Sequence, residues 1–390
     1  MNILVTSSRM PFALDEIRKF GRSGHRVFAA DTIYAAPGGH SRYVIERADV
    51  APPQKNSRDF IADIVRLVRR LAIELVVPCF EEAFYLAYHA PLLSRLVRVF
   101  TSEFPLLARL HNKSSFRQLA QTLAIATPRT TTVTSALELG AALRDYPRYF
   151  ARPAWSRGGL ELFTNSGPLA GALLLDDCAP SAKRPWIVQE FVDGQDLCSF
   201  SVAQHGRVVA HCTYFHPKVI EHAGGIVFES IVDGETLACV KRIVEATGYH
   251  GQISMDFIRG PRGLVVLECN PRPTAGVHLM PQEMLVDAVL GHVNGTVALT
   301  PAGVRRMYAA ALVRDALLHP TQMSGDLAYL LSEVGDIYGE AGDRLPALFQ
   351  VLSYGSVLSY RMRHRERARP GTKLMAAYFD GITWDGQPIN

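Results

Sequence analysis

The 390-residue chain lacks the features that mark several classes of protein. No run of about 18 apolar residues occurs, so no transmembrane helix is predicted. The N-terminus has no basic region followed by an apolar stretch, which argues against a secretory signal. The formal net charge is only +4, which gives no reason to expect nucleic-acid binding. We therefore expect a soluble cytoplasmic protein that binds neither membranes nor nucleic acids.

Metal-binding cysteine and histidine motifs are absent as well. None of the six cysteines forms a Cys-x-x-Cys pair, so neither a zinc site nor a disulfide framework is indicated. Four histidines have no HExxH-type spacing and are interpreted as structural or cleft-lining residues: His211, His216, His222 and His278. We expect all the cysteines to be reduced thiols.

The N-terminal part of the sequence shows an alternating β-α-β pattern. Residues 2–5 and 26–31 are predicted strands, and an amphipathic helix is predicted between them over 11–22. Such a unit implies parallel strands with a right-handed crossover. Residues 1–105 are therefore predicted to form a small Rossmann-like domain, although it lacks the GxGxxG glycines of dinucleotide-binding domains.

Charged residues follow the predicted strand ends of this domain. Glu81 and Glu82 come after the strand at 75–77, and loop 7–9 follows the first strand. Open α/β sheets build their binding clefts at the carboxyl ends of their strands. Contact with solvent explains such charges equally well, so both interpretations stay open.

The most informative segment is 251–276, which has the pattern of two strands joined by a turn. Asp256 lies in the first strand, and Glu268 and Asn270 end the second. Side chains two residues apart on a strand share a face, so these two converge and a hairpin brings Asp256 beside them. Two carboxylates and an amide oxygen suit Mg²⁺, which is usually held by few protein groups plus substrate phosphates. Arg272 follows, with a planar fork that can grip a phosphate or a carboxylate.

Asp256 and the later Glu268-Cys269-Asn270-Pro271-Arg272 resemble the metal-binding end of ATP-grasp enzymes. These enzymes include D-alanine–D-alanine ligase, biotin carboxylase and many carboxylate–amine ligases. The resemblance implies ATP as cofactor, with Mg²⁺ or Mn²⁺ held by Asp256, Glu268 and Asn270. It also implies that Arg272 is catalytic and neutralises the γ-phosphate or a developing acyl phosphate. The alternative interpretation is a surface hairpin with acidic ends.

The resemblance also assigns residues to the phosphates of ATP. Lys113 matches the first phosphate lysine, and Arg152 stands where the family commonly has the lysine of a Lys-Pro pair. Arginine keeps the charge but is bulkier. The turn that contains Ser156, Gly158 and Gly159 resembles the loop that closes over the phosphates, where backbone amides favour anions.

Segment 186–196 resembles the adenine hinge of the family, with main-chain groups on the adenine edge and a carboxylate on the ribose. The residues assigned to these contacts are Gln189, Glu190, Phe191, Val192 and Asp196. The alternative is an ordinary strand–turn–strand, because Asp193-Gly194 is a standard turn pair. Lys218 is predicted as a second catalytic residue that reaches the γ-phosphate ahead of the glycine pair at 224–225. An exposed lysine without that role is the other interpretation.

The predicted fold is multidomain, α/β and α+β. Residues 106–298 follow the N-terminal domain as an ATP-grasp fold of two α+β subdomains, with a lid at about 127–192. Residues 299–390 should be mainly helical, with a buried helix at 307–318, a second helix at 326–334 and a hairpin turn at 384–386. The arginine-rich stretch 361–369 is interpreted as a solvated helix face rather than a nucleic-acid site.

The leading functional prediction is an ATP-dependent carboxylate–amine ligase. It would form an amide through an acyl phosphate and release ADP and phosphate. Its partners would be a small-molecule carboxylate and an amine, and a homodimer is the expected assembly because two-fold dimers are the commonest oligomers. Two alternatives stay open: the same chemistry with bicarbonate or a thiol as acceptor, and a non-catalytic ATP-binding regulatory protein.

Overall fold

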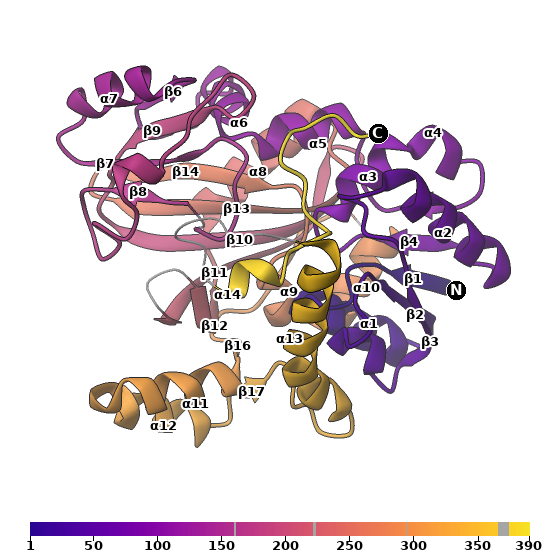
Figure 1. The fold of residues 1–390 in the computed structure, drawn as a ribbon. Coiled ribbons are helices and arrows are strands. Elements are labelled where there is room, and N and C mark those ends of the chain that lie inside the picture. The colour runs from indigo at the N-terminus through magenta and orange to yellow at the C-terminus, as the bar shows by residue number, and fades with distance from the viewer. Residues whose placement is uncertain (160, 221–223, 294, 366–373) are drawn as a thin grey trace.

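The computed structural model describes residues 1–159, 161–220, 224–293, 295–365 and 374–390. Within these residues the chain forms a parallel sheet, a small antiparallel sheet and a large mixed sheet, with helices packed around them (Figure 1). The predicted multidomain α/β and α+β class is thus confirmed. No helix among the described residues combines the length and apolar character needed to cross a bilayer.

The N-terminal sheet has the strand order β3-β2-β1-β4-β5, with every pair parallel. Its strands are β1 (Asn2–Val5), β2 (Arg26–Asp31), β3 (Val44–Asp49), β4 (Leu75–Val77) and β5 (Arg98–Val99). The accompanying helices are α1 (Pro11–Arg22), the 3₁₀ turn η1 (Pro37–His40), α2 (Ser57–Arg70), α3 (Glu82–Tyr88), α4 (Ala90–Leu93) and α5 (Phe104–His111). The predicted β-α-β unit is correct. The order reverses between β1 and β4, and the loops after these two strands lie at the kind of switch point where open α/β sheets form their binding clefts.

The small antiparallel sheet has the order β6-β9-β7-β8. Its elements are α6 (Lys113–Thr122), β6 (Thr130–Val133), α7 (Ala136–Arg144), β7 (Tyr149–Pro153), β8 (Phe163–Thr164), η2 (Leu175–Asp177) and β9 (Trp186–Glu190). Helix α7 starts where a cap is available, because Ser135 Oγ accepts a hydrogen bond from the backbone of Glu138 at 3.2 Å. Trp186, Val188 and Leu139 are buried in its own apolar core.

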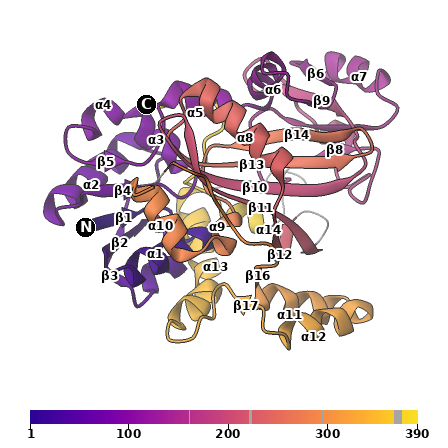
Figure 2. The ribbon, with the colours of Figure 1, turned by 180° about the vertical axis from the view of Figure 1, so that it is seen from behind.

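The large sheet has the order β14-β13-β10-β11-β12-β16-β17, and β15 pairs with β11. Its elements are β10 (Gln195–Gln204), β11 (Arg207–Ile220), β12 (Gly224–Ile231), α8 (Gly234–Thr247), β13 (Gly251–Gly260), β14 (Gly263–Asn270), α9 (Gly276–Leu279), α10 (Gln282–Leu290), β15 (Ala298–Leu299), β16 (Arg305–Met307) and β17 (Gly335–Asp336). One apolar core joins α1 to strands β10 and β11 and to α10, so the N-terminal sheet and the large sheet share buried residues. The view from behind shows α9 and α10 close to α1 (Figure 2).

The C-terminal residues form α11 (Ala309–Leu318), η3 (Pro320–Gln322), α12 (Met323–Leu330), α13 (Leu345–His364) and α14 (Leu374–Ala377). A helix does form where one was predicted at 307–318, over Ala309–Leu318, but the expectation that it is buried is wrong for one of its sides. Val313, Leu317 and Leu318 on α11 are exposed, since only one side of α11 packs on the rest of the chain. The second helix begins earlier than predicted, at Met323. Among the described residues no strand forms around 384–386, so the hairpin expected there is wrong too.

Candidate active site

The β13–β14 hairpin brings the predicted metal ligands together. The antiparallel register places Asp256 directly opposite Glu268, and Asn270 Nδ2 donates to Glu268 Oε1 at 3.3 Å. Glu268 and Asn270 are both buried. Cys269, between them, is buried in an apolar core, as the alternation of a strand predicts. The convergence expected from the sequence is therefore confirmed.

Two cations from other elements meet Glu268. Arg152, on β7, forms an ion pair with Glu268 Oε2. Lys113 Nζ lies 3.4 Å from the same oxygen and donates to the carbonyl of Ser156 at 2.6 Å. Lys113 is the first residue of α6, which begins there because Asn112 caps the helix through Ser114 and Ser115. One carboxylate thus links the hairpin, the small sheet and α6.

Burial makes these charges strongly interdependent. It raises the pKa of Asp256 to about 8, with the neighbouring Glu268 acting in the same direction. Burial also works against ionisation of Glu268, but Lys113 and Arg152 outweigh it and hold the pKa of Glu268 well below its usual range. The pKa of Lys113 is lowered by burial to about 8, although Glu268 opposes the shift. The pair of carboxyls therefore shares one negative charge near neutral pH, held by Glu268.

Arg272 joins this cluster to the switch point of the N-terminal sheet. Its Nη2 lies 3.3 Å from Asn270 Oδ1, and its guanidinium stands 4.4 Å above the ring of Phe80. Its Nε is 4.0 Å from Glu81 Oε1. Burial lowers the pKa of Arg272, while Glu81 counteracts that shift. The predicted catalytic arginine thus lies between the metal-ligand residues and the strand ends of the first domain.

Glu81 is the centre of a second buried cluster that sequence reasoning left undecided. Arg157 Nε donates to Glu81 Oε1 at 2.6 Å, and the backbone N–H of Trp384 donates to its other oxygen at 2.9 Å. Arg157 also donates to the carbonyl of Trp384 at 2.7 Å. Contact with solvent does not explain the charge of Glu81, because the residue is fully buried, and its place in a binding cleft stays a prediction. No role was predicted for Arg157 from the sequence. Its position as a charged residue inside a glycine-containing turn is the signal that could have identified it.

The turn predicted to cover phosphates adopts a backbone that requires glycine. Gly158 and Gly159 have φ of 58° and 66°, in the left-handed region. Ser156 is buried, and its hydroxyl donates to the carbonyl of Pro153 at 2.9 Å. The start of the turn is therefore held in place beside Lys113. The next part of the turn has two backbone conformations that residues with a side chain rarely adopt.

The predicted hinge residues lie at the end of β9 and just beyond it. Gln189 is buried and donates to Thr130 Oγ1 at 3.1 Å. The Glu190 carboxylate accepts from the backbone of Arg129 at 3.1 Å and from Arg262 at 3.2 Å. Phe191 and Val192 are half-buried beyond the end of β9. These contacts do not test whether the segment binds adenine, so that role stays a prediction.

Asp196 shares a face of the large sheet with the metal-ligand residues. It precedes Cys198 by two positions on β10, and Cys198 pairs directly with Asp256 on β13. Asp196, Cys198 and Asp256 therefore point to the same side of the sheet. Cys198 also pairs with Tyr214 on β11, which adds a buried phenol to that face. Neither of these two residues was predicted from the sequence.

Lys218 has a different set of partners. Its Nζ lies 2.8 Å from Asp326 and 3.0 Å from Asp315, both buried carboxylates of α11 and α12. The structure thus connects Lys218 with the C-terminal helices, and its role at the γ-phosphate stays a prediction. The described histidines of this group have protein partners: His211 contacts Ser201 and Thr213, His278 contacts Asp15 at 2.7 Å, and the ring of His216 packs against Tyr214 and Phe228. His222 lies outside the described residues.

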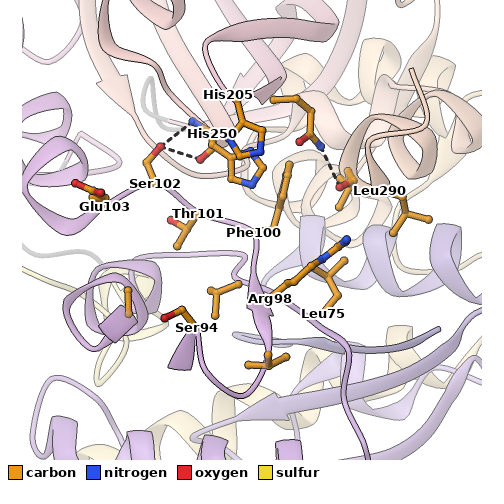
Figure 3. Close-up of a pocket in the computed structure, with 15 residues that line it drawn as sticks. Leu75, Ser94, Arg98, Phe100, Thr101, Ser102, Glu103, His205, His250 and Leu290 are labelled. Atoms are coloured by element: carbon orange, nitrogen blue, oxygen red, sulfur yellow. Dashed lines mark hydrogen bonds between the residues drawn. The ribbon is translucent and has the colours of Figure 1, made fainter. Parts of the chain in front are cut away.

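A cavity of about 420 Å³ lies elsewhere, between the end of the N-terminal sheet and the β10–β11 turn (Figure 3). His205 and His250 stack there with ring centroids 4.2 Å apart. Ser102 Oγ donates to the carbonyl of His250 and accepts from its backbone N–H. None of the metal-ligand or phosphate residues lines this cavity, so it is separate from the carboxylate cluster.

The donor set of the cluster fits magnesium better than a transition metal. Asp256, Glu268 and Asn270 offer oxygen atoms, which Mg²⁺ prefers, and two carboxylates are a usual number when phosphates complete the coordination. Within the described residues no group of three or more His, Cys, Asp or Glu side chains is placed to hold a metal ion by itself. A metal held here would need ligands besides the two carboxylates and the amide oxygen.

No protein-family model and no curated protein matches the sequence. Solved structures do match. N5-carboxyaminoimidazole synthetase from Staphylococcus aureus, complexed with ADP, is similar with a TM-score of 0.62 over 83% of this chain and 86% of that chain, at 10% identity. Phosphoribosylamine–glycine ligase from Thermotoga maritima has a TM-score of 0.58 over 78% of each chain, at 13% identity. L-amino acid ligase from Bacillus licheniformis has a TM-score of 0.54 over 74% of each chain, at 16% identity.

The chain has the ATP-grasp fold. The ATP-grasp likeness extends over at least 74% of this chain in each of these comparisons, so it includes far more than the β13–β14 hairpin. At such low identity it establishes the architecture only. The roles of individual ATP-grasp residues in this chain must be argued from its own side chains.

Proposed function

We propose that this protein is an ATP-dependent ligase that joins a small-molecule carboxylate to an amine. One observation carries the proposal: Glu268 lies opposite Asp256 and holds both Arg152 and Lys113 on its Oε2 atom. Mutual neutralisation of this kind keeps two cations and two carboxyls poised in a buried site. The structural neighbours, named as ligases or synthetases, support the same class of reaction.

The proposed mechanism is an exchange of partners around Glu268. Bound Mg·ATP would place its phosphates beside Lys113 and Arg152. These two cations would then leave Glu268, whose carboxylate would become available to the metal. Asp256, Glu268 and Asn270 would hold Mg²⁺, which neutralises phosphate charge when bound. Since the site is buried, each of these interactions is stronger than it would be in water.

In the first proposed step, a substrate carboxylate oxygen attacks the γ-phosphorus, the bond to the β-phosphate oxygen breaks, and ADP leaves. Arg272 lies beside Asn270 and carries the charge needed near the transferred phosphoryl group. In the second step, an amine nitrogen attacks the acyl carbon, phosphate leaves with the bonding pair, and the amine loses a proton. Positioning and charge neutralisation account for the catalysis, so no covalent protein nucleophile is needed.

The substrates are expected to meet near the switch point of the N-terminal sheet. Arg272 and Arg157 both contact the buried Glu81 there, from the hairpin and from the glycine turn. Two guanidinium groups beside one carboxylate provide binding groups for a zwitterionic or anionic small molecule.

The test is to incubate the protein with Mg·ATP, pools of amino acids and small carboxylates, and hydroxylamine. The proposal predicts ADP together with a hydroxamate, because hydroxylamine intercepts an acyl phosphate. AMP with pyrophosphate would contradict the mechanism. ADP formed only with bicarbonate would indicate that the protein is a carboxylating enzyme. Tight ATP binding without any turnover would favour a regulatory protein.

A further inference from the structure

Helix α13 presents an apolar stripe to solvent. Leu348, Leu352, Leu358 and Met362 are 55%, 47%, 58% and 69% exposed, and Gly355 is exposed at the midpoint. We call five positions the stripe: Leu348, Leu352, Gly355, Leu358 and Met362. Leu345, Val351 and Tyr354 on the same helix are exposed as well, at 55%, 66% and 47%. The opposite side of the helix packs on the rest of the chain through Pro346, Ser353, Val357 and Tyr360. A helix that is apolar on both sides is normally buried on both sides.

The stripe is symmetric about Gly355. Leu352 and Leu358 stand three residues to either side of it, and Leu348 and Met362 stand seven residues to either side. In an antiparallel pair of identical helices crossing at Gly355, each residue before the glycine faces the residue equally far after it. Leu352 would then meet Leu358 of the second copy, and Leu348 would meet Met362.

Gly355 has no explanation within its own chain. A Cβ atom at this position would find no atom of the described residues within 4 Å, and the residue lies inside a helix rather than at its end. Glycine inside a helix is destabilising relative to alanine. Close approach of a second helix backbone at this point accounts for the choice, because only glycine leaves room for it.

We propose that this chain forms a two-fold homodimer in which α13 of one copy crosses α13 of the other, antiparallel, at Gly355. Other C-terminal segments also expose apolar side chains. Leu317 and Leu331 are 76% and 86% exposed, and Figures 1 and 2 place α11 and α12 at the same end of the molecule as the start of α13. Monomers rarely expose apolar patches beyond a few hundred Å², whereas a stable interface buries about 800 Å² on each partner.

Other occupants fit the stripe less well. Segment 366–373, with the sequence Glu-Arg-Ala-Arg-Pro-Gly-Thr-Lys, is rich in charge and offers no apolar complement. A helix that lies on a membrane pairs its apolar face with a charged, solvated face. The face of α13 opposite the stripe is instead buried against protein, with Ser353 hydrogen-bonded to Tyr378 at 3.0 Å.

Cysteine cross-linking of the full-length chain tests the crossing point. The six natural cysteines are all buried, so one introduced thiol dominates mild oxidation. A mixture of Leu352→Cys and Leu358→Cys should give a disulfide-linked dimer, whereas either variant alone, and Leu137→Cys at an 85% exposed position on α7, should give only traces. Equal cross-linking of the mixture and of Leu137→Cys would overturn the proposal.

Sedimentation of the wild-type chain provides an independent test. We expect a dimer at micromolar concentration, and an increase in its Kd of at least about tenfold in Leu352→Glu, with circular dichroism unchanged because the side chain is half exposed in the monomer. A wild-type chain that stays monomeric would overturn the proposal. Binding of that monomer to phosphatidylcholine–phosphatidylserine vesicles would assign the stripe to a membrane instead.

Discussion

The β13–β14 hairpin buries charged side chains, whereas helix α13 exposes apolar ones. The hairpin buries Glu268 with two cations, and α13 leaves seven large apolar side chains in water. Both arrangements cost free energy in the isolated chain, since buried charges lose hydration and exposed apolar groups order water. The difference suggests that each region is completed by something else: a charged ligand at the hairpin, and an apolar partner at the helix.

The largest effect is expected from removing the charge of Glu268. Glu268→Gln should reduce turnover by about 10²–10³-fold, because the carboxylate both faces the metal position and positions Arg152 and Lys113. It should also destabilise the chain by about 3–5 kcal/mol, since two buried cations lose their partner. Initial rates and chemical denaturation measure the two effects. Glu245→Gln, on the exposed side of α8, is the control. Wild-type stability in Glu268→Gln would contradict the buried ion cluster.

Asp256→Asn should reduce turnover while sparing the fold at high pH. The pKa of Asp256 is raised from 3.8 to about 8, so between these values the folded state retains a proton that the unfolded state has lost. The contribution of Asp256 to the free energy of unfolding must then fall as pH rises from about 4 to about 8. Asparagine cannot ionise, so Asp256→Asn should show a flatter dependence of Tm on pH than the wild type. Exposed Asp287→Asn is the matched control, and identical slopes in all three proteins would refute the raised pKa.

Lys218→Met separates a structural lysine from a catalytic one. The buried carboxylates of Asp315 and Asp326 would lose a cation, so we expect a loss of about 3 kcal/mol in stability. Turnover at a temperature where the variant is folded should change by less than about threefold. Lys183→Met, at an exposed loop position, serves as the control. A hundredfold loss of turnover with unchanged Tm would instead support the predicted γ-phosphate role.

The mildest change within the ion cluster itself is Arg152→Lys. The lysine restores the residue that ATP-grasp enzymes commonly have, and it keeps the charge opposite Glu268. We expect turnover and the KM for ATP to stay within about tenfold of the wild type, while Arg152→Met should lose far more. Equal losses in both variants would show that the planar guanidinium, rather than its charge, is required.

The sequence was sufficient to predict the hairpin because strand alternation is a local rule. Asp256, Glu268 and Asn270 are spaced so that a two-residue repeat and one turn bring them together, and the structure confirms this. The N-terminal β-α-β unit followed from equally local patterns. These parts needed no knowledge of distant contacts.

The remaining features depend on contacts between distant segments. Arg157 and Trp384 meet Glu81 from positions far along the chain, and no periodicity links them. The partners of Lys218 were missed for the same reason, since the sequence does not show that Asp315 and Asp326 face it. The exposure of α11 was missed because an apolar run predicts burial whether the partner lies in the same chain or in another.

The most direct test of the account is calorimetric titration of ATP into the protein with and without Mg²⁺. The exchange of partners around Glu268 predicts binding at least about tenfold tighter with Mg²⁺, and loss of that difference in Glu268→Gln, because the carboxylate is then no longer available to the metal. ATP binding that is equally tight with and without Mg²⁺, or absent in both, would contradict the assignment of this cluster as a metal–nucleotide site.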